Sequence, residues 1–402
     1  MSRHTGFANL PLHPGRAPAW LFTRMARLSR EIATHIVADR GPEELLRRLS
    51  DPFWFQAFGC VLGFDWHSSG VTTTVTGAIK EGLRGIEHDL GVFVQGGKGA
   101  TSRKTPTEIL DRCERLSVDP TPLLYASRMT AKVDNAAVQD GYQLYHHSFF
   151  FTVGGHWCVV QQGMSDRTRS ARRYHWLSDA LSSYVNEPHS AICSDARVAT
   201  LNLVAAEHAA LRRSSTELAS GRPEQVMNIV RRYAHGGPKR SARIATTAAS
   251  LRLPFPDEGE AASSEEAPTL DMPSRHALLL HDIDPRRLES VLLSTYDRAP
   301  ADFESLLGLK GVGGRTLRAL ALVSEVIYGT PSSTRDPARF AFAHGGKDGT
   351  PFPVDRATYD RTIDTLHRAM ARAKVDRSDK IDALKRLSRF AKATEPQTPV
   401  HT

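Results

Sequence analysis

The feature that most constrains the fold is a pair of apolar segments separated by two glycines. Residues 142–151 and 157–162 are rich in aromatic and β-branched residues, and Gly154-Gly155 lies between them. This pattern is typical of two antiparallel strands joined by a tight turn. Neighbouring strand residues point to opposite faces, so Phe149-Phe150-Phe151 places aromatic rings on both faces. We therefore expect a β-hairpin in a sheet that other elements cover on both faces.

The open end of this predicted hairpin is polar. If the turn is centred on its two glycines, His147 pairs with Gln162. His146 and His147 are adjacent on the strand, so we expect their side chains on opposite faces, where they cannot share one metal ion. Buried polar groups require hydrogen-bond partners, and this end of the hairpin is therefore a candidate site.

Helical patterns accompany the hairpin along the chain. Apolar residues recur at helical spacing over residues 20–39, and Pro42 and Pro122 occupy positions that suit the first turn of a helix. Residues 72–83 also fit a helix. The fold class is therefore expected to be α+β: a mixed α/β N-terminal domain with a sheet that contains the β-hairpin, and an all-helical C-terminal helix-hairpin-helix domain.

A length of 402 residues suggests two or three domains. Residues 254–274 are acidic, proline-rich and poor in apolar residues, so they cannot bury enough surface to offset chain entropy and are expected to form a linker. The predicted division is as follows: 1–203, a mixed α+β candidate catalytic domain; 204–253, a basic helical segment; 254–274, the acidic linker; 275–391, a helical DNA-binding domain; and 392–402, a disordered tail.

Composition excludes several classes of protein. The chain is 40% hydrophobic and 24% charged with a net charge of +8, which excludes collagen-like, coiled-coil and wholly disordered chains and suits a polyanionic partner. No apolar stretch approaches the ~18 residues of a membrane span. The four cysteines are far apart without CxxC spacing, and the N-terminus lacks an apolar signal segment, so we expect a cytoplasmic protein.

The most specific motif is the Gly-Val-Gly turn in residues 306–316, which lies between two apolar helical patterns. This segment resembles a helix-hairpin-helix DNA-binding element. Gly311 and Gly313 allow the backbone to approach a phosphate, the dipole of the second helix favours an anion, and Lys310 and Arg315 add positive charge. Backbone contacts of this kind carry little base specificity. The alternative is a helical hairpin that serves only packing.

The same segment resembles the base-excision glycosylases that contain a helix-hairpin-helix, in which a lysine of the second helix and a downstream aspartate carry out the chemistry. Arg315 stands at the lysine position, and an arginine stays protonated, so no Schiff base is expected. Asp336 is an off-register match for the aspartate.

Two further clusters suit phosphate or metal. Asp65 and His67 lie two residues apart before a hydroxyl-rich helix start, which suits a divalent metal and an anion; the pattern resembles the first motif of metallophosphoesterases, whose later Gly-Asn-His-Glu motif is absent. The glycine-rich segment 96–105 carries Lys98, Arg103 and Lys104, which could cradle a phosphate, although it is no Walker A loop. A capped helix and a solvated loop are the structural alternatives.

The candidate catalytic residues lie on or after the helix that begins near Pro122. Lys132, Asp134 and Asp140 follow one another in this region, and Asp140 with His147 would make a hard-ligand site for Mg²⁺ or Mn²⁺ together with Asp65 and His67. Lys132 would neutralise a transition state. Downstream, Arg172 and Arg173 belong to a basic run with interleaved aromatics, which suits a nucleic-acid backbone.

The chain resembles a family of archaeal and bacterial proteins known as domain of unknown function 763. The segments that carry the resemblance are 10–13, 47–56, 63–70, 96–99, 127–129, 132–135, 139–141, 145–147, 161–164, the helix-hairpin-helix segment and 344–349. The resemblance suggests a DNA-repair context and assigns no catalytic residue.

The leading hypothesis is a DNA-binding protein of repair or processing, acting as a metal-dependent nuclease or phosphoesterase on single- or double-stranded DNA. A non-catalytic DNA-binding repair scaffold is the alternative, and an RNA-processing enzyme is a third possibility.

Overall fold

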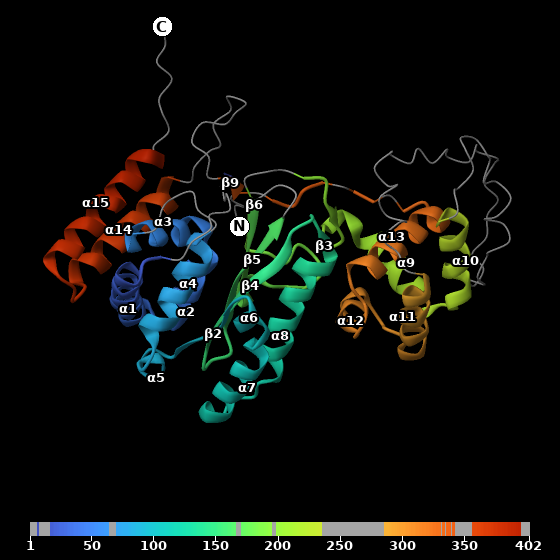
Figure 1. Cartoon of the computed structure of the whole chain (residues 1–402), viewed down its shortest axis with the longest axis horizontal. Coiled ribbons are helices and arrows are strands. Elements are labelled where there is room, and N and C mark those ends of the chain that lie inside the picture. The colour runs from blue at the N-terminus through green and yellow to red at the C-terminus, as the bar shows by residue number, and fades with distance from the viewer. Residues whose placement is uncertain are drawn as a thin grey trace, which may run out of the picture. The chain divides into compact units, whose positions relative to one another are not determined.

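We describe a computed structural model of the chain, in which two compact units form (Figure 1). Unit 1 comprises residues 1–206 and 334–402, and unit 2 comprises residues 207–333. The structure describes residues 6–7, 17–63, 70–165, 170–194, 198–234, 285–330, 332–333, 335–338, 340–341 and 356–394. The acidic segment 254–274, Asp65 and His67 lie outside these residues.

Unit 1 is built on an antiparallel sheet, which confirms the α+β class. Its strands are β2 (Val92–Lys98), β4 (Gln143–Thr152), β5 (Trp157–Ser165), β6 (Ser170–Leu177) and β7 (Ala191–Ser194). They lie in the order β7-β6-β5-β4-β2, and the short parallel strands β9 (Phe340–Ala341) and β1 (Gly6–Phe7) extend the sheet beyond β7. β4 and β5 are the two strands of the hairpin that the sequence predicts.

The register of this hairpin differs from the prediction by one residue. His147 pairs with Gln161 rather than with Gln162, and His146 is the partner of Gln162. The turn is not centred on the two glycines: the last pair is Phe151 with Trp157, and Thr152 N–H donates to the carbonyl of His156. The longer turn moves the pairs from His146 to Phe151 by one position, and an irregularity between Leu144 and His146 shifts the pairs beyond it by one more.

Helices cover both faces of the sheet (Figure 1). One face packs against the N-terminal helices α1 (Ala19–Arg40), α2 (Pro42–Ser50), α3 (Pro52–Leu62) and α4 (Gly70–Leu83). The other packs against α7 (Thr105–Leu116) and α8 (Thr121–Lys132). Because His146 contacts Thr76 of α4 and His147 contacts Ser127 of α8, the two histidines lie on opposite faces. We call these the α4 face and the α8 face.

Short elements connect these layers. α5 (Glu87–Leu90) precedes β2, and α6 (Ala100–Arg103) follows it. After α8 comes a π-helical turn, η1 (Val133–Ala137), and then β3 (Val138–Gln139), which pairs with β8 (Leu201–Asn202). The 3₁₀ turn η2 (Ser178–Ala180) follows β6.

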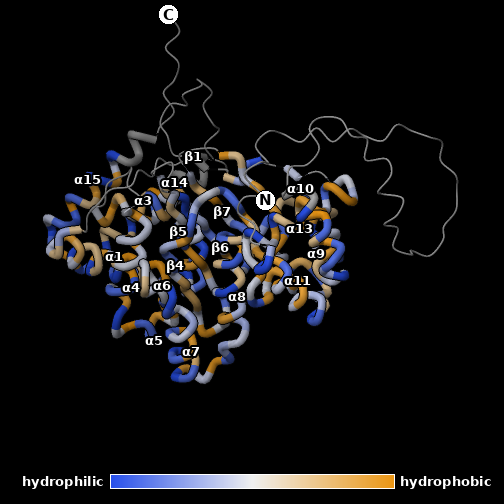
Figure 2. The backbone as a smooth tube through the Cα atoms, turned by 45° about the vertical axis from the view of Figure 1, so that its right-hand side comes forward, coloured by the Kyte–Doolittle hydropathy of each residue, from blue (hydrophilic) through white to orange (hydrophobic). Residues whose placement is uncertain are grey.

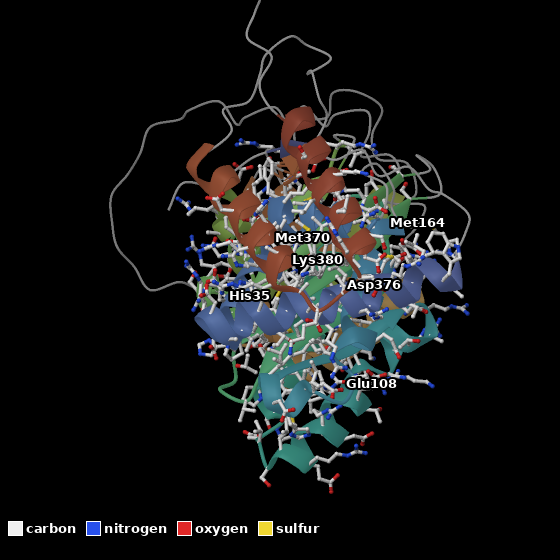
Figure 3. The ribbon with its side chains drawn as sticks, turned by 90° about the vertical axis from the view of Figure 1, so that its left-hand side faces the viewer. His35, Glu108, Met164, Met370, Asp376 and Lys380 are labelled. Carbon is white, nitrogen blue, oxygen red and sulfur yellow. The ribbon has the colours of Figure 1, made fainter. Side chains whose placement is uncertain are left out.

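Helices α14 (Arg356–Arg372) and α15 (Arg377–Thr394) correct the predicted domain boundaries. The sequence pattern predicted that they belong to a helical domain over residues 275–391. Instead they pack on α1 and α3 and add Leu366, Met370 and Leu387 to the core of unit 1. Figure 3 shows them crossing α1, with Met370 labelled. Their apolar stripes need a partner surface, and the N-terminal helices supply it.

Unit 2 is helical in the described residues. It contains α9 (Ala209–Ser220), α10 (Pro223–Ala234), α11 (Pro285–Arg298), α12 (Phe303–Gly308) and α13 (Gly314–Tyr328), preceded by the 3₁₀ turn η3 (Ala206–His208). α9 and α10 pack on α11 and α13, so the described part of the basic segment predicted over 204–253, residues 204–234, shares a core with the helices that follow. Figure 2 shows hydrophobic and hydrophilic residues alternating along these helices. None of the helices in the described ranges is long and apolar enough to span a membrane.

The packing of α14 against the N-terminal helices predicts that a substitution in this helix lowers the stability of unit 1. Met370 has no exposed surface, so Met370→Ala should leave a cavity and lower the free energy of unfolding by about 2–5 kcal/mol. Urea denaturation followed by circular dichroism measures this loss. Lys385→Ala on the exposed side of α15 is the control and should change it by less than about 0.5 kcal/mol. Equal effects of the two substitutions would contradict the core role of α14.

Candidate functional site

Polar side chains gather around β4, β5 and β6, in the middle of unit 1. On the α8 face the centre is Asp134, which lies in the π-helical turn and has no exposed surface. Its Oδ2 accepts hydrogen bonds from Gln161 Nε2 and Trp176 Nε1, and its Oδ1 accepts one from His189 Nε2. A π-helical turn displaces one residue from the α-helical repeat, and such turns are frequent at functional sites.

Gln161 links Asp134 to a histidine and a serine. Its Nε2 faces two acceptors, Asp134 and the carbonyl of Thr130 at 3.0 Å, so its Oε1 must be the acceptor of the 2.7 Å bond from His147 Nδ1. With its proton on Nδ1, His147 accepts at Nε2 from Ser127 Oγ, 3.0 Å away. The donor and the acceptor of each hydrogen bond between Asp134 and Ser127 thus follow from one carboxylate, because a carboxylate can only accept hydrogen bonds. Burial lowers the pKa of His147, so this ring is neutral.

A second network lies on the α4 face. His146 Nε2 is 3.0 Å from Thr76 Oγ1 and 3.1 Å from Ser148 Oγ. Gln162 accepts from Thr72 and donates to the hydroxyl of Tyr145. The pKa of His146 is lowered to about 3, first by burial and then by the neighbouring His147 and Lys98. This network is neutral at physiological pH.

Asp140 belongs to a third group, which is charged. Arg172 lies between two carboxylates, with Nη1 3.0 Å from Asp140 and Nη2 2.8 Å from Asp336, and all three side chains are at most 5% exposed. Tyr174 also donates to Asp140 at 2.7 Å. Burial raises the pKa of Asp140, and Arg172 opposes that rise. Burial disfavours the charge of Arg172, but the carboxylates outweigh it and raise its pKa.

The structure corrects the prediction that Arg172 and Arg173 contact a nucleic-acid backbone. Both side chains project from β6, an inner strand of the sheet, and both are fully buried. Arg173 donates to Gln56 Oε1 at 3.2 Å and to His175 Nε2 at 2.9 Å, and it packs on the ring of Phe55. Guanidinium groups enclosed in this way hold elements together and cannot reach a phosphate in solvent.

Asp140 and His147 do not fit the predicted Mg²⁺ or Mn²⁺ site. The charge that a divalent cation requires from Asp140 is already neutralised by Arg172, and both ring nitrogens of His147 have protein partners. Where the structure describes the chain, no group of three or more His, Cys, Asp or Glu is arranged to hold a metal ion. Lys132 is half-buried, and burial followed by Arg128 lowers its pKa.

Lys98, Arg103 and Lys104 are exposed, as a phosphate-contacting role requires. The glycines beside them have a structural task as well: Gly96 has a φ of +83°, and a Cβ there would lie 2.2 Å from the carbonyl oxygen of His147. Glu108 accepts from Gly96 N–H at 2.8 Å and from Lys80 at 2.7 Å. The loop is therefore a fixed turn that carries cations at its surface.

In unit 2, the predicted turn joins α12 to α13 over residues 309–313. Lys310 and Arg315 are exposed, and a Cβ at Gly313 would meet nothing within 4 Å. Gly311 has a φ of +92°, which favours glycine, whereas Val312 is buried and anchors the turn. No side chain caps the N-terminus of α13.

Three residues of these networks were not predicted as site residues from the sequence: His189, Gln161 and Asp336. His189 follows Glu187-Pro188 in a loop, and nothing in its local pattern reveals that it reaches Asp134. Asp336 is 164 residues away from Arg172 along the chain. The sequence could have indicated Gln161, because a glutamine in a buried apolar strand requires hydrogen-bond partners.

One family matches the chain. The family described as "Protein of unknown function (DUF763)" matches residues 6–354. The chain belongs to this family. Residues 356–394 lie beyond the match, yet α14 and α15 complete the core of unit 1 in this DUF763 protein. Comparison with curated proteins and with solved structures finds no similar protein.

The Arg172 group predicts a pH-dependent stability effect. Arg172→Met leaves Asp140 without its cation, which should lower the free energy of unfolding by about 3–5 kcal/mol at pH 7. A carboxyl group with a raised pKa in the folded state favours folding when protonated. The loss should therefore shrink as the pH falls through the raised pKa of Asp140.

Urea unfolding of both proteins at several pH values measures this difference. Arg84→Met is the control, because the ion pair of Arg84 with Glu81 is exposed and should contribute little at any pH. A difference between wild type and Arg172→Met that stays constant with pH would show that Asp140 is not the group left unpaired.

Proposed function

We propose that this protein binds DNA through backbone phosphates and acts in DNA repair or processing. The observation that carries the proposal is the turn between α12 and α13, which is exposed, bears Lys310 and Arg315, and is open to space at Gly313. α13 is 15 residues long, so its dipole adds to the attraction of an anion at its N-terminus.

The packing of the turn supports binding over a purely structural role. Leu306, Leu307 and Val312 are buried and fix the turn to the helices of unit 2. The polar and glycine positions remain at the surface. A turn that served only packing would have no need to expose two cations and to leave space beside Gly313, whereas a phosphate contact requires both.

Unit 1 contributes a second candidate surface, made of Lys98, Arg103 and Lys104. Lys98 Nζ lies 5.8 Å from the centre of the Tyr145 ring, so a cation and a half-buried aromatic ring occur together. This combination suits a nucleic-acid strand, in which phosphates and bases alternate. Because the contacts are to backbone and to base faces, we expect little sequence specificity.

The metal-dependent nuclease or phosphoesterase hypothesis has less support than DNA binding. Asp140 and His147 do not fit a divalent ion, so we derive no metal-dependent step from them. Mg²⁺ or Mn²⁺ remains a prediction that concerns Asp65 and His67, which lie outside the described residues. A non-catalytic DNA-binding scaffold remains the alternative. All four cysteines are free and buried, which supports the cytoplasm as the place of action.

The salt dependence of DNA binding tests the turn. Lys310→Ala/Arg315→Ala should weaken binding, and the slope of log K against log salt should fall in magnitude by about 1.8 if each cation neutralises one phosphate. Fluorescence anisotropy with a labelled duplex and a labelled single strand, at several salt concentrations, measures both quantities.

Lys385→Ala/Arg389→Ala is the matched control, because it removes the same charge from exposed positions of α15. It should leave the slope unchanged. If the two double variants weakened binding equally, DNA binding would depend only on the net charge of the protein, and the proposed role of the turn would be wrong. Competition by unlabelled RNA stronger than by DNA would favour the RNA-processing alternative.

A further inference from the structure

The hydrogen bond between Asp134 and His189 connects the interior of unit 1 to a residue that is partly exposed. Asp134 is fully buried, whereas the His189 side chain is 8% exposed. Ser127 and His147, at the other end of the α8-face network, are buried. His189 is therefore the most exposed residue of this network.

The surroundings of Asp134 fix the tautomer of His189. A carboxylate only accepts hydrogen bonds, so His189 carries a proton on Nε2, and in the neutral ring the lone pair then lies on Nδ1. Trp176 and Tyr174 keep the ring in place, with ring centres 4.4 and 6.1 Å from that of His189. A histidine oriented by a buried carboxylate through one nitrogen is poised to take a proton at the other.

Both segments that meet in this bond have unusual backbone conformations. Asp134 lies in the π-helical turn η1, and Glu187, two residues before His189, has a φ of +49°. The surrounding structure holds Glu187 in place: its N–H donates to the carbonyl of Val204 at 2.8 Å, and its Oε1 accepts from Ala206 N–H at 3.1 Å. A non-glycine residue with a left-handed backbone conformation and a π-helical turn are both frequent at functional sites.

We propose that Asp134 and His189 form an acid–base dyad in unit 1, in which His189 Nδ1 accepts a proton from a bound water or alcohol hydroxyl group. In this step the O–H bond breaks, an N–H bond forms at Nδ1, and the electron pair stays on the oxygen, which becomes a nucleophile. Asp134 is the positioning residue: it orients the ring and stabilises the imidazolium. The step uses no metal ion and does not depend on DNA binding by unit 2.

Acylation by diethyl pyrocarbonate tests the dyad without any substrate, because the reagent attacks unprotonated, accessible imidazole nitrogens. The folded full-length chain is treated briefly, digested and examined by mass spectrometry. His189 should be modified, while the buried His146, His147 and His175 stay unmodified. His156 is the matched comparison: it also pairs with an aspartate, Asp179, but it lies in solvent at 46% exposure.

Asp134→Asn distinguishes orientation from mere packing. Gln161 and Trp176 both donate to one oxygen of Asp134, so the new amide must keep its oxygen there and point its NH₂ group at His189. His189 Nε2 would then accept, and the proton would move to Nδ1. The acylation rate of His189 should fall at least about tenfold, because the reacting nitrogen would carry a proton. The rate at His156 should not change.

Nitrogen-15 NMR of the histidine rings supplies a second measurement on the wild-type protein. It should show Nε2 protonated and Nδ1 unprotonated in His189, and the reverse in Asp134→Asn, with circular dichroism confirming that the variant is folded. The proposal is overturned if His189 is not acylated in the wild type, if its rate is the same in the variant, or if wild-type Nδ1 carries the proton.

Discussion

The architecture of unit 1 depends on how charged groups are accommodated on a sheet whose two faces are both covered by helices. The buried guanidinium of Arg172 is neutralised by two carboxylates, those of Asp140 and Asp336, whereas the buried guanidinium of Arg173 is held by hydrogen bonds to Gln56 and His175. In the sequence, Asp140 precedes unit 2 and Asp336 follows it. Asp336 also accepts from Val198 N–H at 2.7 Å and from Ala338 N–H at 2.9 Å. One cation thus ties β6 to the segment in which the chain returns to unit 1.

The same constraint explains why the polar residues of β4 and β5 form networks and not a metal site. On the α8 face a single carboxylate, Asp134, sets the direction of the hydrogen bonds to Gln161 and His189, and through Gln161 to His147. On the α4 face His146 contacts Thr76 and Ser148, and Gln162 contacts Thr72 and Tyr145. The two networks reach partly exposed residues at His189 and Tyr145.

Units 1 and 2 divide the candidate functions between them. The α12–α13 turn of unit 2 offers charge and open backbone, which suit a phosphate and require no buried polar group. Unit 1 offers oriented side chains, and orientation is what proton transfer requires. A DUF763 protein that combined both would hold a nucleic-acid backbone with one unit and supply an acid–base group with the other.

The sequence by itself determined the elements whose patterns are local. The hairpin followed from two apolar runs and their glycines, α1 and α4 from helical spacing, and the α12–α13 turn from its Gly-Val-Gly segment, because side-chain periodicity and glycine conformation act over a few residues. Only the tertiary structure decided that α14 and α15 complete the N-terminal core, and that Arg172 and Arg173 are buried. A basic run next to aromatic residues is the same in sequence whether its strand lies at an edge or in the middle of a sheet. The Asp134–His189 pair is likewise a product of folding, since it joins residues 55 positions apart that no periodicity connects.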